Sequence, residues 1–291
     1  MNNKKIYLHI GLEKTGSTFI QSVLFANKEA LYDGGIEYPD GLFRYENMME
    51  LTSAYADEYN LINVLRPKST AGFRKELVEY ILSKTESNIV FSSEHLSSRL
   101  QSIEQVYLLL NDLKVANHEI IILAYVRSPK EWVISQYCQY IKSGGKATLS
   151  SYLSNNVRLD TYIKKALSPA SNIKMWLDTK LISSAHIEKY EDAKKFGLIN
   201  SFKNIIGINI LPLESPNNNT NPSLNNAQTE LLRLFNNVVT NRFLRKILVK
   251  MLLLLPIPTA NNLSSSDSKL IEEYMNTESI NFKKYLNIEW P

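Results

Sequence analysis

Short runs of apolar and β-branched residues recur along the chain and predict its strands. Four of them begin near residues 5, 88, 119 and 184, with the sequences KIYLHIG, NIVFSSE, EIIILAYV and SAHIEKYE. Runs of this length are typical of parallel strands that are covered on both faces. We therefore expect four buried strands of one parallel sheet.

The segments between these runs show helical periodicity. One helix is predicted after the first run, ending near residue 33, and a second around residues 72–84. The apolar side of the first helix consists of Phe19, Ile20, Val23, Leu24 and Leu31. A third helix is predicted to begin at Ser128, with Pro129 in its first turn and Glu131 completing a capping box.

Strands that alternate with helices predict an α/β fold with a central parallel sheet flanked by helices. In such sheets ligands bind at the carboxyl ends of the strands. Three polar clusters fall at these ends, at residues 11–18, 92–98 and 127–129. We expect a functional site where the three clusters meet.

Length and composition are consistent with one domain over residues 1–291, and they limit the kinds of molecule that this domain is expected to bind. A hydrophobic share of 44% allows a large core. We also expect an irregular, aromatic, substrate-facing lobe at 40–70 and a helical part from about 225. The net charge of +4, from 33 basic and 29 acidic residues without a basic tract, disfavours nucleic acid as a partner. The single cysteine, Cys138, excludes an internal disulfide and predicts a reducing, cytoplasmic location.

Two segments bear on membrane attachment. The first apolar run is broken by His9 and followed at once by a glycine loop, so we interpret it as a strand and not as an export signal. Residues 243–258, FLRKILVKMLLLLPIP, are too short to span a bilayer. A packed helix is the favoured interpretation, and peripheral contact with the inner face of a membrane, through Arg245, Lys246 and Lys250, is the alternative.

The stretch HIGLEKTGSTFIQ, residues 9–21, is similar to a phosphate-binding loop with its lysine displaced. Gly11, Gly16 and Thr18 follow the G-x-x-x-x-G-K-[ST] spacing, but Ser17 stands at the lysine position and the lysine is Lys14. Backbone N–H groups at such a helix start bind phosphate oxygens. The loop therefore predicts a phosphorylated ligand.

This loop and the segment YVRSPKEWVISQY together resemble the two cofactor signatures of sulfotransferases that use 3′-phosphoadenosine 5′-phosphosulfate (PAPS). The resemblance implies that the 5′-phosphosulfate is bound by Lys14, Thr15, Gly16, Ser17 and Thr18, and the 3′-phosphate by Arg127 and Ser135. The segments FSSEHLS, HIEKYED and TNPSLN further resemble bacterial sulfotransferases that act on carbohydrates. A glycan or glycolipid acceptor, sulfated at a hydroxyl or an amine, is implied in the same way.

Sulfuryl transfer sets requirements that these residues meet. Lys14 is suited to stabilise charge on the leaving phosphate, and the arrangement requires no metal. The acceptor hydroxyl needs a base, for which Glu94 and His95 are the candidates, with Glu94 favoured by the resemblance. Because successive strand residues point to opposite faces, we expect only one of the two to face the site.

Two other functions stay open. A P-loop kinase is disfavoured by Ser17 and by the lack of an aspartate at the end of a predicted strand. A non-catalytic nucleotide-binding protein with the same fold is disfavoured by the presence of Lys14, Arg127, Ser135 and Glu94.

Overall fold

The computed structural model describes residues 4–43, 47–56, 70–85, 87–153, 168–208, 224–257 and 265–290. The chain separates into two compact units, which are described one at a time. The first comprises residues 1–127 and 161–218, and the second residues 128–160 and 219–291. Most of the lobe predicted at residues 40–70 lies outside the described residues.

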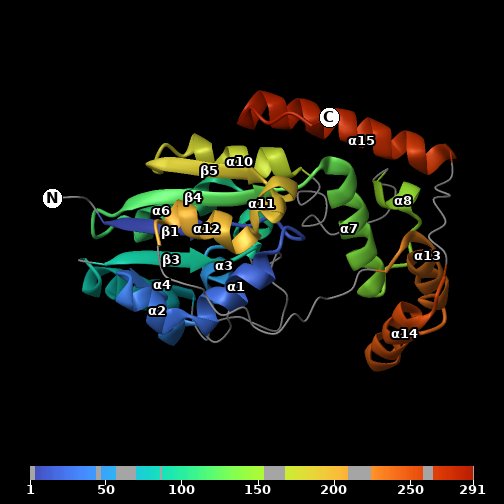
Figure 1. Ribbon diagram of the computed structural model, residues 1–291, viewed down its shortest axis with the longest axis horizontal. Coiled ribbons are helices and arrows are strands. Elements are labelled where there is room, and N and C mark those ends of the chain that lie inside the picture. The colour runs from blue at the N-terminus through green and yellow to red at the C-terminus, as the bar shows by residue number, and fades with distance from the viewer. Residues whose placement is uncertain are drawn as a thin grey trace. The chain divides into compact units, whose positions relative to one another are not determined.

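The first unit is an α/β layer structure (Figure 1). Its strands are β1 (Lys5–His9), β2 (Ile36–Glu37), β3 (Asn88–Ser92), β4 (Glu119–Val126) and β5 (Ser184–Lys189). Its helices are α1 (Ser17–Ala26), α2 (Lys28–Asp33), η1 (Asp40–Leu42), α3 (Met49–Ser53), α4 (Thr70–Ser83), α5 (His95–Arg99), α6 (Ile103–Leu113), α10 (Pro169–Asp178), α11 (Tyr190–Phe196) and α12 (Leu198–Ile206).

The five strands form one all-parallel sheet in the order β2-β3-β1-β4-β5, which confirms the predicted fold class. In the register, His9 of β1 pairs with Ser92 of β3 and with Leu123 of β4. The carboxyl ends of β1 and β3 therefore lie side by side, and the end of β4 follows on the other side of β1.

The four predicted strands are present, with one correction. β1, β3 and β4 are buried, but β5 is the edge strand and is half exposed, so its prediction as a buried strand was wrong. The two-residue strand β2 was not predicted, because a pairing this short leaves no periodic pattern.

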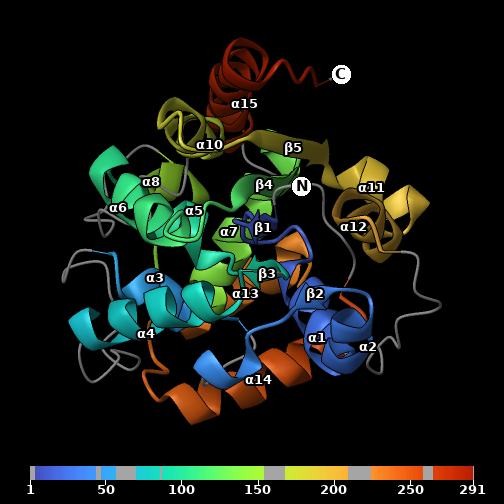
Figure 2. The ribbon, with the colours of Figure 1, turned by 90° about the vertical axis from the view of Figure 1, so that its left-hand side faces the viewer.

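Helices cover both faces of the sheet. Figure 2 shows α1, α2, α11 and α12 on one side and α3, α4, α5, α6 and α10 on the other. The first predicted helix is divided at Asn27, so that Ile20, Val23 and Leu24 are buried from α1 and Leu31 from α2. Fully buried apolar strand residues such as Ile6, Leu8 and Phe91 fill the core between the layers.

The second unit is helical. Its elements are α7 (Pro129–Lys142), α8 (Leu149–Leu153), α13 (Asn226–Phe235), α14 (Arg242–Leu254) and α15 (Ser265–Leu286). The predicted start of α7 is confirmed, because Ser128 Oγ accepts a hydrogen bond from the Glu131 N–H at 3.4 Å and Pro129 stands in the first turn.

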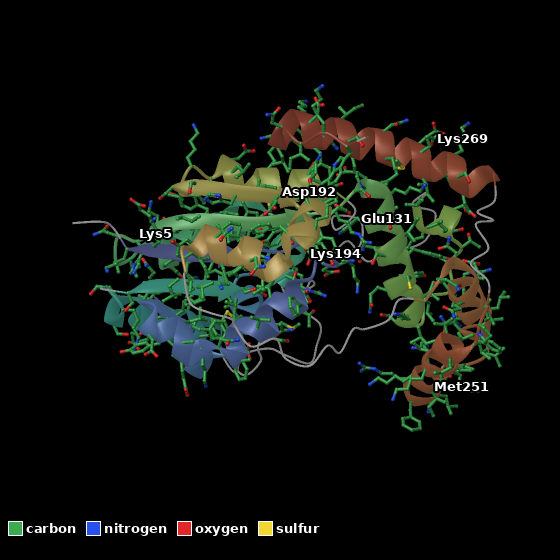
Figure 3. All side chains as sticks on the ribbon, in the orientation of Figure 1. Lys5, Glu131, Asp192, Lys194, Met251 and Lys269 are labelled. Atoms are coloured by element: carbon green, nitrogen blue, oxygen red, sulfur yellow. The ribbon has the colours of Figure 1, made fainter. Side chains whose placement is uncertain are left out.

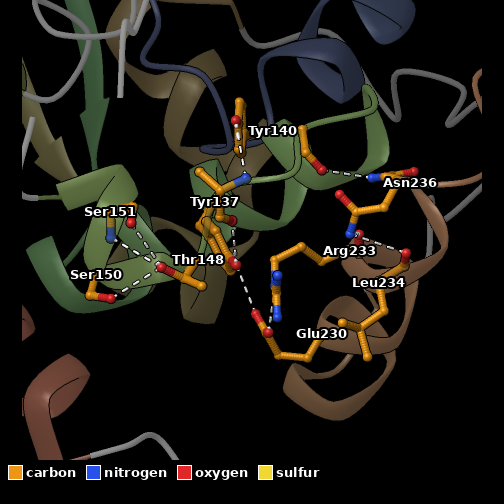
Figure 4. Close-up of polar contacts among 12 residues, drawn as sticks. Tyr137, Tyr140, Thr148, Ser150, Ser151, Glu230, Arg233, Leu234 and Asn236 are labelled. Carbon is orange, nitrogen blue, oxygen red and sulfur yellow. Dashed lines mark hydrogen bonds and ion pairs between the residues drawn. The ribbon is translucent and has the colours of Figure 1, made fainter. Parts of the chain in front are cut away.

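Polar contacts join α7 to α13 (Figure 4). The Tyr137 hydroxyl donates to Glu230 Oε1 at 2.7 Å, and Arg233 Nε donates to Glu230 Oε2 at 2.7 Å. Asn236 Nδ2 donates to the carbonyls of Ile141 and Gly145, both at 2.8 Å. These bonds fix the end of α7 against the predicted C-terminal helical part.

Candidate functional site

The site is built on the loop between β1 and α1, which the sequence singled out. Gly11, Lys14 and Gly16 have positive φ angles of 45°, 70° and 81°. A Cβ at Gly11 would lie 3.1 Å from Glu94 Cα, and one at Gly16 would lie 2.4 Å from Leu198 Cδ2. Both glycines are therefore required by their backbone conformation and by close packing.

This loop opens directly into the ten-residue helix α1. Gly16 is its N-cap, and glycine has no side chain with which to cap the backbone amides of the first turn. Amides in this position, together with the positive end of the helix dipole, suit an anionic ligand.

The loop hydroxyls are arranged differently from one another. Thr15 Oγ1 donates to the Leu12 carbonyl at 2.6 Å, and Ser17 Oγ donates to the same carbonyl at 3.2 Å. Both side chains are buried, whereas Thr18 is exposed. Thr15 and Ser17 thus hold the loop closed in this structure, and a role for them in phosphate binding rests on their backbone N–H groups.

Glu94 and His95 lie beside this loop, but not on a strand as expected. β3 ends at Ser92, Glu94 is the N-cap of α5, and His95 is the first residue of that helix. The argument from strand alternation was therefore wrong for this pair. The segment is joined to the loop by two bonds: Ser93 N–H donates to the His9 carbonyl at 3.0 Å, and the Ser97 hydroxyl donates to the Gly11 carbonyl.

The pKa values of the two candidate bases are shifted in opposite directions. Burial raises the pKa of Glu94 to about 7; the charge of Glu13 also raises it, while Lys14 and Arg99 lower it. Burial, followed by the charge of Arg99, lowers the pKa of His95 to about 4. Arg99 Nε also donates to His95 Nδ1 at 3.5 Å. At neutral pH His95 is thus uncharged with one ring nitrogen engaged, whereas Glu94 gains and loses its proton near neutral pH.

Arg127 follows β4 at the same edge of the sheet. Its Nε lies 3.8 Å from Glu191 Oε1, and its Cζ lies 5.8 Å from the centroid of the Tyr190 ring. Tyr190 also borders the loop, because its Cε2 lies 3.3 Å from the position of a Cβ at Gly16. The tyrosine therefore lies between the glycine loop and Arg127.

Sequence reasoning missed Tyr190 and Leu198 as neighbours of the loop. The motif HIEKYED was noted, but nothing local in it indicates that its tyrosine packs against a glycine 174 residues earlier in the chain. The signal was the position of Tyr190 directly after a strand, the same position that singled out Gly11 and Arg127.

The structure also describes Ser135, Gln21 and His9. Ser135 lies on α7 in the second unit, and its part in binding the 3′-phosphate stays a prediction. Gln21 of α1 is buried, and its Nε2 donates to the Ser92 carbonyl at 3.5 Å. His9 is a buried strand residue whose Nδ1 lies 2.7 Å from Ser92 Oγ. Within the described part of the chain, no group of three or more His, Cys, Asp and Glu side chains is placed to hold a metal ion.

Comparison with known proteins yields a structural likeness. No family model matches the chain, and no curated protein matches it. The crystal structure of a sulfotransferase from Alicyclobacillus acidocaldarius matches 100% of this chain and 98% of its own length, with a TM-score of 0.54 and 9% sequence identity. At this identity the likeness establishes that the two proteins share a fold.

Proposed function

We propose that the chain is a sulfotransferase that moves the sulfuryl group of PAPS to a hydroxyl of a glycan or glycolipid. The observation that carries the proposal is the pairing of a glycine loop at a helix start with Glu94, whose Cα and Cβ pack against Gly11 and whose carboxyl has a pKa of about 7. The shared fold supports the proposal, and so do the two signatures that resemble PAPS-dependent enzymes.

The loop and α1 suit the 5′ end of the donor. The backbone amides at Ser17 and the residues after it would bind phosphosulfate oxygens, with Lys14 supplying a positive charge. In the donor only the bond between sulfur and the bridging phosphate oxygen breaks, so negative charge grows on that oxygen. Lys14 would stabilise this charge as it develops.

Glu94 would act as the general base. As the acceptor oxygen forms its bond to sulfur, its proton passes to the carboxylate, and the products are the sulfated acceptor and adenosine 3′,5′-bisphosphate. A carboxylate with a pKa near 7 accepts a proton more readily than an ordinary glutamate, yet is still largely ionised in slightly alkaline solution.

Arg127 would bind the 3′-phosphate. Its guanidinium lies one strand away from the loop, and a planar guanidinium is suited to bind two phosphate oxygens at once. The nearby Glu191 carboxylate holds the guanidinium at the edge of the sheet, and a phosphate would compete with that carboxylate for the same donors.

A calorimetric titration tests the donor assignment. Adenosine 3′,5′-bisphosphate should bind without Mg²⁺ and more tightly than either 5′-AMP or ATP with Mg²⁺. A lost charge-assisted hydrogen bond costs about 1.5–3 kcal/mol, so Arg127→Ala should weaken the bisphosphate at least about tenfold and leave 5′-AMP nearly unchanged. Lys195→Ala, which removes an exposed charge paired with Asp192, is the control and should change neither affinity.

Two outcomes would contradict the proposal. Tight binding of ATP that depends on Mg²⁺, with weak binding of the bisphosphate, would favour the kinase alternative. Equal losses of bisphosphate and 5′-AMP affinity in Arg127→Ala would show that Arg127 does not bind the 3′-phosphate.

A further inference from the structure

Helix α14 of the second unit exposes an apolar stripe along its length. Phe243, Ile247, Met251 and Leu254 follow one another at intervals of four, four and three residues, and therefore lie on one side of the helix. Their side chains are 70%, 41%, 55% and 85% exposed. Figure 3 labels Met251 on this helix.

The stripe continues beyond the helix. Val238, in the turn before α14, is 83% exposed, and Leu255, directly after it, is 49% exposed. Single exposed apolar residues are ordinary, but a contiguous group of this kind marks a surface that binds something.

The opposite side of α14 is packed within its own unit. Leu252 is 3% exposed, and its carbonyl accepts a hydrogen bond from Gln228 Nε2 at 2.7 Å. Arg245 donates to the Ser143 carbonyl at 3.1 Å and to the carbonyls before the helix. The orientation of α14 is thus fixed by contacts that leave the apolar stripe outward.

Positive charge borders the stripe on one side. Arg242, Lys246 and Lys250 are exposed and spaced four residues apart, so they form a row parallel to the apolar residues. The sequence from 231 to 266 contains no aspartate or glutamate. The charged side chains of α14 itself are therefore all basic.

We propose that α14 docks on the surface of an anionic lipid bilayer. The helix would lie in the plane of the interface, with Phe243, Met251 and Leu254 at the headgroup–acyl boundary and the basic row against lipid phosphates. Charge complementarity selects this occupant over a second copy of the chain, whose α14 would bring the same positive row against it. In the described part of the chain no helix is long and apolar enough to cross a membrane.

The proposal does not depend on sulfuryl transfer, so the two can fail separately. If both hold, a glycolipid acceptor would share the surface on which the protein lies. The test therefore uses vesicle binding alone and needs neither donor nor acceptor.

Co-sedimentation of the full chain with vesicles is the direct experiment. We expect binding to vesicles of mixed phosphatidylglycerol and phosphatidylcholine, weakened by added salt, and little binding to pure phosphatidylcholine. Lys246→Glu combined with Lys250→Glu should lower the partition coefficient at least about 25-fold, on the basis of about fivefold per basic residue near the surface. Leu254→Ser should lower it about tenfold through lost apolar contact.

Matched variants elsewhere on the surface serve as controls. Lys75→Glu combined with Lys269→Glu makes the same change in net charge on α4 and α15, and Ile280→Ser removes a 65% exposed apolar side chain from α15. Both should bind vesicles like the unchanged chain, and all variants should keep its circular dichroism spectrum and thermal midpoint.

Three results would overturn the proposal. The first is no preference for anionic over neutral vesicles. The second is an equal loss of binding in the control variants. The third is self-association in sedimentation velocity that Leu254→Ser abolishes, in a chain that does not bind vesicles, since that result would assign the stripe to a second copy.

Discussion

Glu94→Gln should separate the stability of this protein from its activity. The pKa of the carboxyl rises from an ordinary 4.5 to about 7, chiefly through burial. As the pH rises, the Glu94 carboxyl loses its proton near pH 4.5 in the unfolded chain but only near pH 7 in the folded chain. The free energy of unfolding therefore falls between these two pH values and stays at its lower value above them. At about 1.4 kcal/mol per pH unit, the rise from 4.5 to about 7 costs at most about 3.5 kcal/mol, an upper bound because the side chain keeps some solvent contact.

The sign of this effect is opposite to that of an ordinary salt-bridged carboxylate. A glutamine of the same shape has no charge to bury, so Glu94→Gln should be more stable than the unchanged chain at pH 8 and nearly equal to it at pH 5. Urea unfolding at the two pH values measures the difference. An exposed Glu79→Gln variant is the control and should show no such pH dependence.

Whereas Glu94→Gln should raise stability at pH 8, it should lower activity. For the unchanged chain, kcat/KM for sulfate transfer should fall about tenfold per pH unit below about 7, as Glu94 becomes protonated. In Glu94→Gln, turnover should fall about 10²- to 10⁴-fold at every pH, with bisphosphate affinity unchanged. The neighbouring charges supply an internal test: Glu13→Gln should move the acidic limb to lower pH and Lys14→Met should move it to higher pH.

Two results would refute this reasoning. One is a Glu94→Gln variant with nearly full activity, above all if His95→Asn were inactive, which would exchange the roles of the two residues. The other is a variant that is no more stable at pH 8 than at pH 5 relative to the unchanged chain.

The remaining predictions concern the junction between the loop and α5. Ser97→Ala removes the donor to the Gly11 carbonyl and should lower turnover about tenfold with bisphosphate affinity nearly unchanged, whereas Ser98→Ala, its control, should have little effect in the same kinetic assay. Gly11→Ala should lower the free energy of unfolding by about 1–3 kcal/mol, because its φ is positive and a Cβ would meet Glu94 Cα at 3.1 Å. Gly41→Ala, where nothing lies within 4 Å, should leave the free energy of urea unfolding nearly unchanged.

The fold was largely predictable because its signals are local. Continuous apolar runs identified β1, β3 and β4, and Ser128 with Pro129 identified the start of α7. The order of the strands was not predicted, since it depends on which residues pair across distances of more than 80 positions. The exposure of β5 is likewise a property of its place at the edge of the sheet, not of its sequence.

The site was predicted residue by residue but not as a geometry. The positions of Lys14, Glu94 and Arg127 after strands follow from sequence, whereas the bond from Ser97 to Gly11 and the packing of Tyr190 on Gly16 are tertiary contacts. The difference in pKa between Glu94 and His95, to which burial and the charge of Arg99 contribute, also needed the structure, and which of the two is the base stays a prediction.

β1 lies between β3 and β4 in the sheet, and this order fixes the distance between those two strands. Glu94 follows the strand on one side of β1 and Arg127 follows the strand on the other side. Neighbouring strands lie about 4.8 Å apart, so main-chain hydrogen bonds hold the two strands that precede these residues about 10 Å apart. A ligand that contacts both residues would therefore have to span the carboxyl ends of three neighbouring strands.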